Sequence, residues 1–192
     1  GLTVSQNQAQ RARQLCQGLP VEIRLQDYRS VTGRFDRIVS LGMFEHVERK
    51  NHGLYMEVAK RCMHPRGLFL LHSIGSVTWM HTPDPWIRKY IFPLGDIPSR
   101  KQITNAARYL LEIRDWHEFG RFYDFTLMAW HERFVHAWPE LERRYAHLER
   151  HRFFRMWTYY LQACAGAFRA RKLQLWQIGL SHPGNHLDYE TV

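Results

Sequence analysis

The sequence predicts an α/β fold whose sheet is mainly parallel, and three observations favour it. Short apolar runs rich in β-branched residues alternate along the 192 residues with stretches that carry helix-capping and helix-ending residues. Hydrophobic residues make up 45% of the chain and aromatic residues 14%, enough for the core of one domain. The apolar runs are shorter than the roughly 20 residues that a membrane-spanning helix needs.

The first half of the chain is expected to alternate strands and helices. Ser5 is a plausible N-cap for the first helix, which Gly18 would end. The cluster His64-Pro65-Arg66-Gly67 would stop a later helix and return the chain to an apolar strand. The expected elements are the end of a strand at 1–5, a helix at 6–17, strands at 21–25 and 35–41, a helix at 53–63 and a strand at 68–74.

The second half begins with a segment that is rich in proline. From residue 82 to 98 four prolines and one glycine interrupt the aromatic residues, so we expect a lid or binding loop that is neither a regular helix nor a strand. Ser99 would cap the next helix, and Pro139 would end a later one. The remaining elements are a helix from 99 to about 107, a strand at 110–116, helices at 123–138 and 151–169, and a strand at 173–180.

The strand predicted at 35–41 is the element around which a site is expected. Its apolar and β-branched side chains favour burial on both faces, and Gly42 would end it. Ligands of open α/β sheets bind beyond the carboxyl ends of the strands, where Glu45 and His46 follow. Alternatively, Glu45 opens a helix and complements its dipole. His72, near the end of the next apolar strand, is a further candidate.

The chain is basic, with 27 lysines and arginines against 18 aspartates and glutamates, and its net charge of +9 favours an anionic partner. Basic and aromatic residues are interleaved between 142 and 172. This stretch could bind nucleic acid, lie on a membrane, or be a solvated helix whose aromatic residues enter the core. A nucleic-acid module should offer an RNP sequence or zinc spacing, and the chain has neither. The three cysteines are far apart and are expected to be reduced thiols.

Six blocks along the chain carry a more specific signal. They are LQDYR at 25–29, GMFEHV at 42–47, FLLHSIG at 69–75, DPWIRKYIFP at 84–93, YDFTLMAW at 123–130 and ACAGAFR at 163–169. In this order they resemble the cyclopropane-fatty-acid synthases, bacterial rather than mycobacterial, from Gly1 to about Ser181. The resemblance implies a class I methyltransferase-like, Rossmann-like fold with a helical insertion, which here lacks the first strand and its Gly-rich turn.

By this resemblance the cofactor is S-adenosylmethionine. Thr3, Val4 and Gln8 would line its ribose and methionine side, and Gln26 and Asp27 would approach the adenine. Without the family, Asp27 is only a turn residue. Neither GxGxxG nor GxxxxGK[ST] occurs in the chain. The resemblance implies no metal.

The resemblance also implies a bicarbonate ion beside the reacting alkene, held by Glu45, His72, the backbone of Ile74 and Tyr123. Methyl transfer to an alkene carbon leaves a carbocation, and ring closure needs a base, so a fixed anion suits both steps. A carboxylate repels bicarbonate unless the two share a proton, so we expect Glu45 to orient His72 or a bicarbonate hydroxyl. The alternatives are a strand-end histidine bonded to a backbone carbonyl and a buried phenol at a helix start.

Residues 1–181 are thus expected to be the C-terminal part of a methyltransferase catalytic domain, and 182–192 a flexible tail. None of Cys16, Cys62 and Cys164 matches the family's bicarbonate-site cysteine, and this chain alone could be inactive. The implied enzyme is a cytoplasmic cyclopropane-fatty-acyl-phospholipid synthase, peripheral at the inner membrane surface, with a homo-oligomer left open. The alternatives are a lipid C-methyltransferase that gives methyl-branched chains and a non-catalytic lipid-binding fragment. The expected membrane contacts are Arg143, Arg144, Arg150 and Arg152, with Trp86 and Phe92 nearer the acyl entrance.

Overall fold

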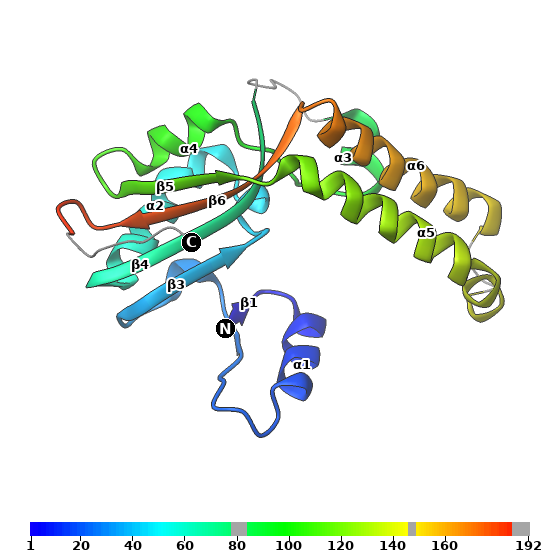
Figure 1. Cartoon of the computed structure of the whole chain (residues 1–192). Helices are drawn as coiled ribbons and strands as arrows, with labels where there is room; N and C mark the ends of the chain where they lie inside the picture. Colours follow the sequence, from blue (N-terminus) through cyan, green and yellow to red (C-terminus); the bar gives the residue numbers. More distant parts are fainter. Residues whose placement is uncertain (78–83, 146–148, 186–192) are drawn as a thin grey trace.

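The computed structural model describes residues 1–77, 84–145 and 149–185, and the side chain of Arg150 is also outside the description (Figure 1). Residues 82 and 83 of the predicted loop and 186–192 of the predicted tail therefore lie outside the described residues. The helices and strands are β1 (Leu2–Thr3), α1 (Gln6–Leu15), β2 (Arg24–Leu25), β3 (Phe35–Leu41), α2 (His52–Cys62), β4 (Met63–Ser76), α3 (Pro85–Tyr90), α4 (Arg100–Ala107), β5 (Glu112–Glu118), α5 (Gly120–Arg144), α6 (Arg150–Arg169) and β6 (Leu173–Ser181).

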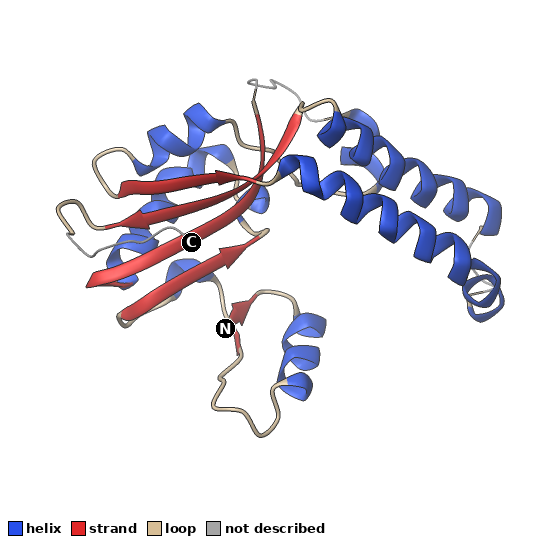
Figure 2. Cartoon of the chain, viewed as in Figure 1, coloured by secondary structure: helices blue, strands red, loops and turns tan. Residues whose placement is uncertain are grey.

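A four-stranded sheet with the order β3-β4-β6-β5 forms the centre of the molecule (Figure 2). β3 pairs with β4 in parallel, whereas β6 is antiparallel to both of its neighbours. β3, β4 and β5 therefore run in one direction, which confirms an α/β fold with a mainly parallel sheet. β1 and β2 pair in parallel as a separate two-stranded sheet.

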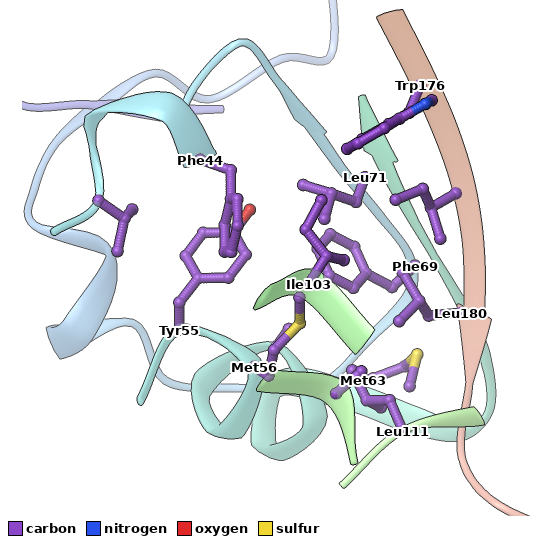
Figure 3. Packing of buried hydrophobic residues seen from close by; sticks show 14 residues of the cluster. Phe44, Tyr55, Met56, Met63, Phe69, Leu71, Ile103, Leu111, Trp176 and Leu180 are labelled. Atoms are coloured by element: carbon purple, nitrogen blue, oxygen red, sulfur yellow. The ribbon is translucent and has the colours of Figure 1, made fainter. Parts of the chain in front are cut away.

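One face of the four-stranded sheet is buried under α2 and α4 (Figure 1). Phe69 of β4 and Leu180 of β6 are almost fully buried there against Met56 of α2 and Ile103 of α4 (Figure 3). Burying such a side chain stabilises the fold by about 1.5–3 kcal/mol. Among the helices of the described residues, none combines the length and the apolar character that crossing a bilayer requires.

The prediction that the strand at 35–41 is covered on both faces is wrong. Val39 is 59% exposed and Leu41 66% exposed. The register with β4 turns Ile38 toward the covered face, alongside Phe69, and Val39 toward the other face. β3 is the edge strand of its sheet, so that face is open at this edge.

Two strand boundaries differ from the prediction. β2 has two residues instead of five because β1, its pairing partner, is itself only two residues long. β4 begins before the breaker cluster, since Met63 already pairs with Phe35. Residues 64–67 then lie opposite the single residue Asp36, and the ladder resumes at Leu68. The breaker cluster therefore interrupts the pairing without ending the strand.

The segment predicted to be an irregular loop contains the helix α3. Its start is fixed by Asp84, whose carboxylate accepts hydrogen bonds from the N–H groups of Trp86 and Ile87, both at 2.9 Å. Pro85 occupies the first helical position, where a missing N–H donor costs nothing. Pro85 therefore helps to start a helix in a segment whose prolines were expected to prevent one.

α5 and α6 form a long helical hairpin that projects from the sheet (Figure 1). α5 continues to Arg144, past Pro139, where it was predicted to end. An interior proline costs about 3 kcal/mol, but aromatic packing against α6 holds the turns on both sides of Pro139. The aromatic rings that pack in this hairpin are Phe134, Trp138, Phe153, Phe154 and Trp157. Phe153, Phe154 and Trp157 of the basic stretch therefore face the neighbouring helix α5.

Candidate active site

The candidate site lies where β3 and β4 end. Gly42 adopts a left-handed backbone with a φ of 60°, which glycine tolerates, and its N–H donates to the carbonyl of His72 at 3.0 Å. The following 3₁₀ turn, η2 (Phe44–His46), carries Glu45. Phe44 is fully buried and packs edge-on against Tyr55 at 4.9 Å. The turn is thus anchored in the core, and Glu45 is held beside the end of β4.

Glu45 reaches β4 through one oxygen and keeps the other unpaired. Its Oε1 accepts a hydrogen bond of 2.7 Å from the backbone N–H of Ile74. Its Oε2 is buried and has no hydrogen-bond partner among the described residues. A buried acceptor without a partner costs about 1–3 kcal/mol, so the arrangement suits a ligand that donates a hydrogen bond. The alternative in which Glu45 only complements a helix dipole leaves this contact with Ile74 unexplained.

His72 points to the open face of the sheet, where Gln177 of β6 lies beside it. The Nδ1 atom of His72 is 3.3 Å from Nε2 of Gln177. If the amide N–H of Gln177 donates to Nδ1, the ring carries its proton on Nε2 and can donate from there. The described partner of the His72 ring is therefore a side chain, whereas the alternative given above expected a backbone carbonyl.

Tyr123 enters the site from the first turn of α5. Its ring packs edge-on against Phe168 at 4.9 Å and Trp130 at 6.0 Å. Burial raises the pKa of the Tyr123 hydroxyl, and the negative charge of Glu45 raises it further. The phenol therefore keeps its proton at neutral pH and can donate a hydrogen bond. Glu45 thus interacts with two of the predicted site residues, with Ile74 through a hydrogen bond and with Tyr123 through its charge.

Sequence reasoning missed two residues of α6 that adjoin Tyr123. Burial raises the pKa of Tyr160 to about 12 and the pKa of Cys164 to about 11, and both groups interact electrostatically with Tyr123. Their spacing of four residues places them on one face of the helix, a signal that the sequence does contain. The three cysteines are free, as predicted, and the raised pKa makes Cys164 a poor nucleophile.

The predicted lid is joined to the Glu45 turn. The N–H of Asp96 donates to the backbone carbonyl of Glu45 at 2.8 Å, and the carboxylate of Asp96 forms an ion pair with Arg49. Phe92 packs edge-on against His46 at 6.0 Å. His46 is exposed and meets the lid, whereas Glu45 turns inward. The segment after α3 thus borders the candidate site.

The residues expected to hold S-adenosylmethionine gather at the carboxyl ends of β1 and β2. Thr3 Oγ1 donates to Gln8 Oε1 at 2.7 Å, and the N–H of Gln26 donates to the carbonyl of Thr3 at 3.0 Å. Asp27 accepts hydrogen bonds from the side chain and N–H of Arg29, which lower its pKa to about 2.

This set fits an adenosine ligand in its chemistry. The ionised carboxylate of Asp27 has acceptor capacity beyond its bonds to Arg29, and amino and ribose hydroxyl groups need acceptors. Val4 is 74% exposed and offers an apolar surface. The cofactor residues and the Glu45 turn lie on different sheets, and no strand ladder joins the two sheets in the described residues.

Among the residues expected to contact a membrane, Arg143, Arg144 and Arg152 are exposed. Arg143 donates to the carbonyl of Pro139, and Arg152 pairs with Glu149 at 3.1 Å. These positions put positive charge along the projecting hairpin.

Comparison with known proteins identifies the family of the chain. A family model described as mycolic acid cyclopropane synthetase matches residues 1–178. The cyclopropane-fatty-acyl-phospholipid synthase of Escherichia coli strain K12 is 54% identical over 181 residues, 94% of this chain and 46% of that protein. The chain therefore spans about half the length of this curated relative.

Solved structures show the fold. A cyclopropane synthase from Mycobacterium tuberculosis matches with a TM-score of 0.83 and 24% identity, covering 94% of this chain and 68% of that chain. A mycolic acid cyclopropane synthase complexed with SAH and CTAB matches with a TM-score of 0.79 and 24% identity over the same shares. The chain therefore has the class I methyltransferase fold that the sequence predicts.

Proposed function

The chain belongs to the mycolic acid cyclopropane synthetase family, and from this premise we propose that it is the C-terminal part of a cyclopropane-fatty-acyl-phospholipid synthase. The enzyme would transfer a methylene from S-adenosylmethionine to the cis double bond of a phospholipid acyl chain. The observation that carries the proposal is Glu45, whose one oxygen accepts from the N–H of Ile74, whose other oxygen is buried and unpaired among the described residues, and whose charge raises the pKa of Tyr123. The name of the 54% identical Escherichia coli relative supports it.

Five residues of the two-stranded region would hold the cofactor. Bound S-adenosylmethionine would supply an electrophilic methyl group. The side chains that would hold it are Thr3, Val4 and Gln8 on the ribose and methionine side, and Gln26 and Asp27 near the adenine. The SAH bound in the structure of a mycolic acid cyclopropane synthase supports the cofactor.

The residues at the ends of β3 and β4 would handle the charge that the reaction creates. The alkene electron pair forms the new carbon–carbon bond and leaves a positive charge on the other alkene carbon. The carboxylate of Glu45 and the aromatic ring of Tyr123 would stabilise this cation in a site from which the core excludes water. Closing the ring then requires the loss of one proton from the new methyl group. The electron pair of the broken C–H bond forms the bond between this carbon and the cationic carbon.

A bicarbonate ion, if bound as the family resemblance implies, would supply the base for that proton. Tyr123, whose raised pKa keeps its hydroxyl protonated, and Nε2 of His72 would donate hydrogen bonds to the ion. Glu45 Oε2 would accept the hydrogen bond of its hydroxyl group, which removes the repulsion between the two anions.

Three variants test these roles in the longest natural form of the protein. Glu45→Gln, His72→Ala and Tyr123→Phe should each lower kcat by about 10²–10³-fold, because they remove groups that act on the developing charge. The KM for S-adenosylmethionine should change little. Glu48→Gln, at an exposed carboxylate that pairs with Lys50, is the matched control.

The product is read by proton NMR of the extracted lipid, which separates a cyclopropane ring from a methyl branch. Added bicarbonate should partly restore a weakened variant. Normal turnover in all three variants, or a loss confined to cofactor binding, would remove these residues from the anion site. A methyl-branched product would show that the protein is a lipid C-methyltransferase and not a synthase. Parent protein that binds lipid without turnover would show that it is a lipid-binding fragment.

The substrate places the protein at a membrane surface, which we take to be the cytoplasmic face of the inner membrane. Basic residues near anionic headgroups contribute about 1 kcal/mol each. Arg143, Arg144, Arg150 and Arg152 would make this contact, with Trp86 and Phe92 nearer the acyl entrance. Reversing the four arginines to glutamate should weaken sedimentation with anionic vesicles. Unchanged sedimentation, with the fold verified by circular dichroism, would assign membrane contact to another part of the protein.

A further inference from the structure

Two cations from different helices converge on one phenol where α3 meets α6. Lys89 Nζ lies 5.1 Å from the ring centre of Tyr90, and the Arg152 guanidinium carbon lies 5.9 Å from it. Lys89 and Arg152 are exposed, whereas Tyr90 is half-buried. Hydrogen bonding by Lys89, and then its charge, lowers the pKa of the Tyr90 hydroxyl, and Arg152 adds to this. Both cations therefore reach the hydroxyl end of the same ring.

The packing of α3 on α6 holds the cations together. Asp84 caps the start of α3, and Trp86 packs edge-on against Tyr159 of α6 at 4.5 Å. Arg152 pairs with Glu149 through one nitrogen, and its guanidinium carries further donors. Glu149 is thus a carboxylate partner of Arg152. An anion between Lys89 and Arg152 would relieve their repulsion and receive donors from both.

We propose that Lys89, Tyr90 and Arg152 bind the phosphate of a phospholipid headgroup at the membrane surface. The choice of a lipid ligand rests on the proposed function. An ammonium, a guanidinium and a phenol hydroxyl are all donors, and together they match the several acceptor oxygens of a phosphodiester. Trp86 and Tyr90, each apolar with a polar tip, suit the boundary between water and lipid.

The site stands at a useful distance from the candidate active site. Phe92, two residues after Tyr90, packs edge-on against both His46 and Tyr160 at 6.0 Å. Tyr160 follows Arg152 on α6 by eight residues, a rise of about 12 Å. A phosphate held at Arg152 would therefore let an acyl chain run along α6 toward Tyr160 and Tyr123.

In the last turn of α5, the described contacts of two other arginines differ from this arrangement. Arg143 donates to the carbonyl of Pro139 on its own helix, and Arg144 lies over the ring of the adjacent Tyr145 at 5.8 Å. Arg143 and Arg144 match Lys89 and Arg152 in charge and exposure. They therefore provide a control that separates a defined phosphate site from general positive charge.

The test measures sedimentation of the 192-residue chain with vesicles of phosphatidylglycerol and phosphatidylcholine. The double variant Lys89→Gln/Arg152→Gln should lower vesicle affinity about ten-fold or more, because two donors to the phosphate are lost together with two positive charges. The control Arg143→Gln/Arg144→Gln, with the same change in net charge, should lower it several-fold less. Tyr90→Phe removes one donor without changing charge and should give a smaller loss, of about three-fold. Circular dichroism verifies that each variant is folded.

Equal losses in the two double variants would overturn the proposal in favour of unspecific charge attraction. Inorganic phosphate tests the source of the ligand, since it should displace the chain from vesicles no better than chloride at equal ionic strength. Displacement by phosphate alone would make this a site for free phosphate and overturn the lipid assignment. The sedimentation assay measures vesicle binding and does not depend on methyl transfer. If the variants change vesicle binding as expected but the activity assay gives no cyclopropane product, the headgroup site is supported and the proposed chemistry is wrong.

Discussion

The two sheets of this protein carry the two halves of the candidate site, and they are stabilised differently. On the face of β4 and β6 that α2 and α4 cover, the apolar side chains are buried in one continuous cluster. α1, beside β1 and β2, buries Ala9, and the rest of that region relies on polar bonds, such as those from Arg13 to the carbonyl of Ile23 at 3.0 and 3.1 Å. Its exposed large apolar residues are Leu2, Val4, Leu15, Leu19, Val21 and Leu25.

Because of this difference in packing, the two halves of the candidate site differ in how well they are ordered before a ligand binds. Glu45 is fixed by the core through Phe44 and by Ile74, so the half of the candidate site at the ends of β3 and β4 is preorganised. Thr3 and Asp27 depend on local hydrogen bonds within 30 residues of chain. Regions with few buried apolar contacts open at low free energy. Cofactor binding would therefore have to order its own half of the site.

The largest expected effect is on the core of the four-stranded sheet. Phe69→Ala should lower the free energy of unfolding by about 3–5 kcal/mol, because Phe69 is 1% exposed and its loss leaves a cavity. Leu15→Ala, at a residue of α1 that is 65% exposed, should change it by less than about 0.5 kcal/mol. Urea unfolding followed by circular dichroism measures both. A comparable loss in Leu15→Ala would show that α1 is packed as firmly as the core.

A smaller effect compares two serine N-caps. Ser99 caps α4 in a capping box with Gln102, and Ser5 caps α1 by accepting from the N–H of Gln8 at 3.3 Å. Ser99→Ala should lower the free energy of global unfolding by about 1 kcal/mol. Ser5→Ala should cost a similar amount in α1 alone, because that helix opens without the core.

Fluorescence and hydrogen exchange separate these two outcomes. The tryptophans of the described residues lie in α3, β5, α5, α6 and β6, so their fluorescence reports on the four-stranded sheet and its helices. Its urea midpoint should fall in Ser99→Ala and stay unchanged in Ser5→Ala. Exchange of the α1 amides should speed up about five-fold in Ser5→Ala. A shift of the fluorescence midpoint in Ser5→Ala would couple the two regions and contradict the comparison.

Where the sequence predicted an element correctly, a local signal identified it. Ser5 and Ser99 are both N-caps in the structure, and β6 ends one residue from its predicted boundary. Asp84 followed by Pro85 is also a local signal, an N-cap before a proline at the first helical position, and it predicts α3 once the two residues are considered together. The prediction of a loop gave too much weight to the number of prolines.

Where the sequence prediction failed, tertiary neighbours decide the outcome. The exposure of Val39 depends on which strands flank β3, and α5 passes Pro139 because aromatic rings of α6 pack against it. Within the candidate site, the resemblance supplied Glu45 and His72. Gln177 could not be predicted as the partner of His72, because the two residues meet through an antiparallel register between strands more than 100 residues apart.

The smallest expected effect tests how local the contacts of the cofactor half are. Asp27 should titrate with a pKa of about 2, below the ordinary value of about 3.9, mainly because the side chain of Arg29 donates to its carboxylate and secondarily because the Arg29 N–H does so. A lowered pKa means that this pair stabilises the turn fully above about pH 4 and that the contribution is lost as the pH falls through about 2.

The carboxyl carbon chemical shift of Asp27, followed by NMR, gives this pKa directly. Arg29→Ala should raise it toward 3.9, and added salt should raise it partly in the parent protein, because an exposed pair is screened. The global unfolding midpoint should be nearly the same in the parent and in Arg29→Ala at pH 7, since both side chains of the pair are exposed and exposed ion pairs contribute little to stability. A pKa near 3.9 in the parent would show that the Arg29 contact does not persist in solution. The two-stranded region would then lack one of the bonds that hold it, and Asp27 would be free to accept from a ligand.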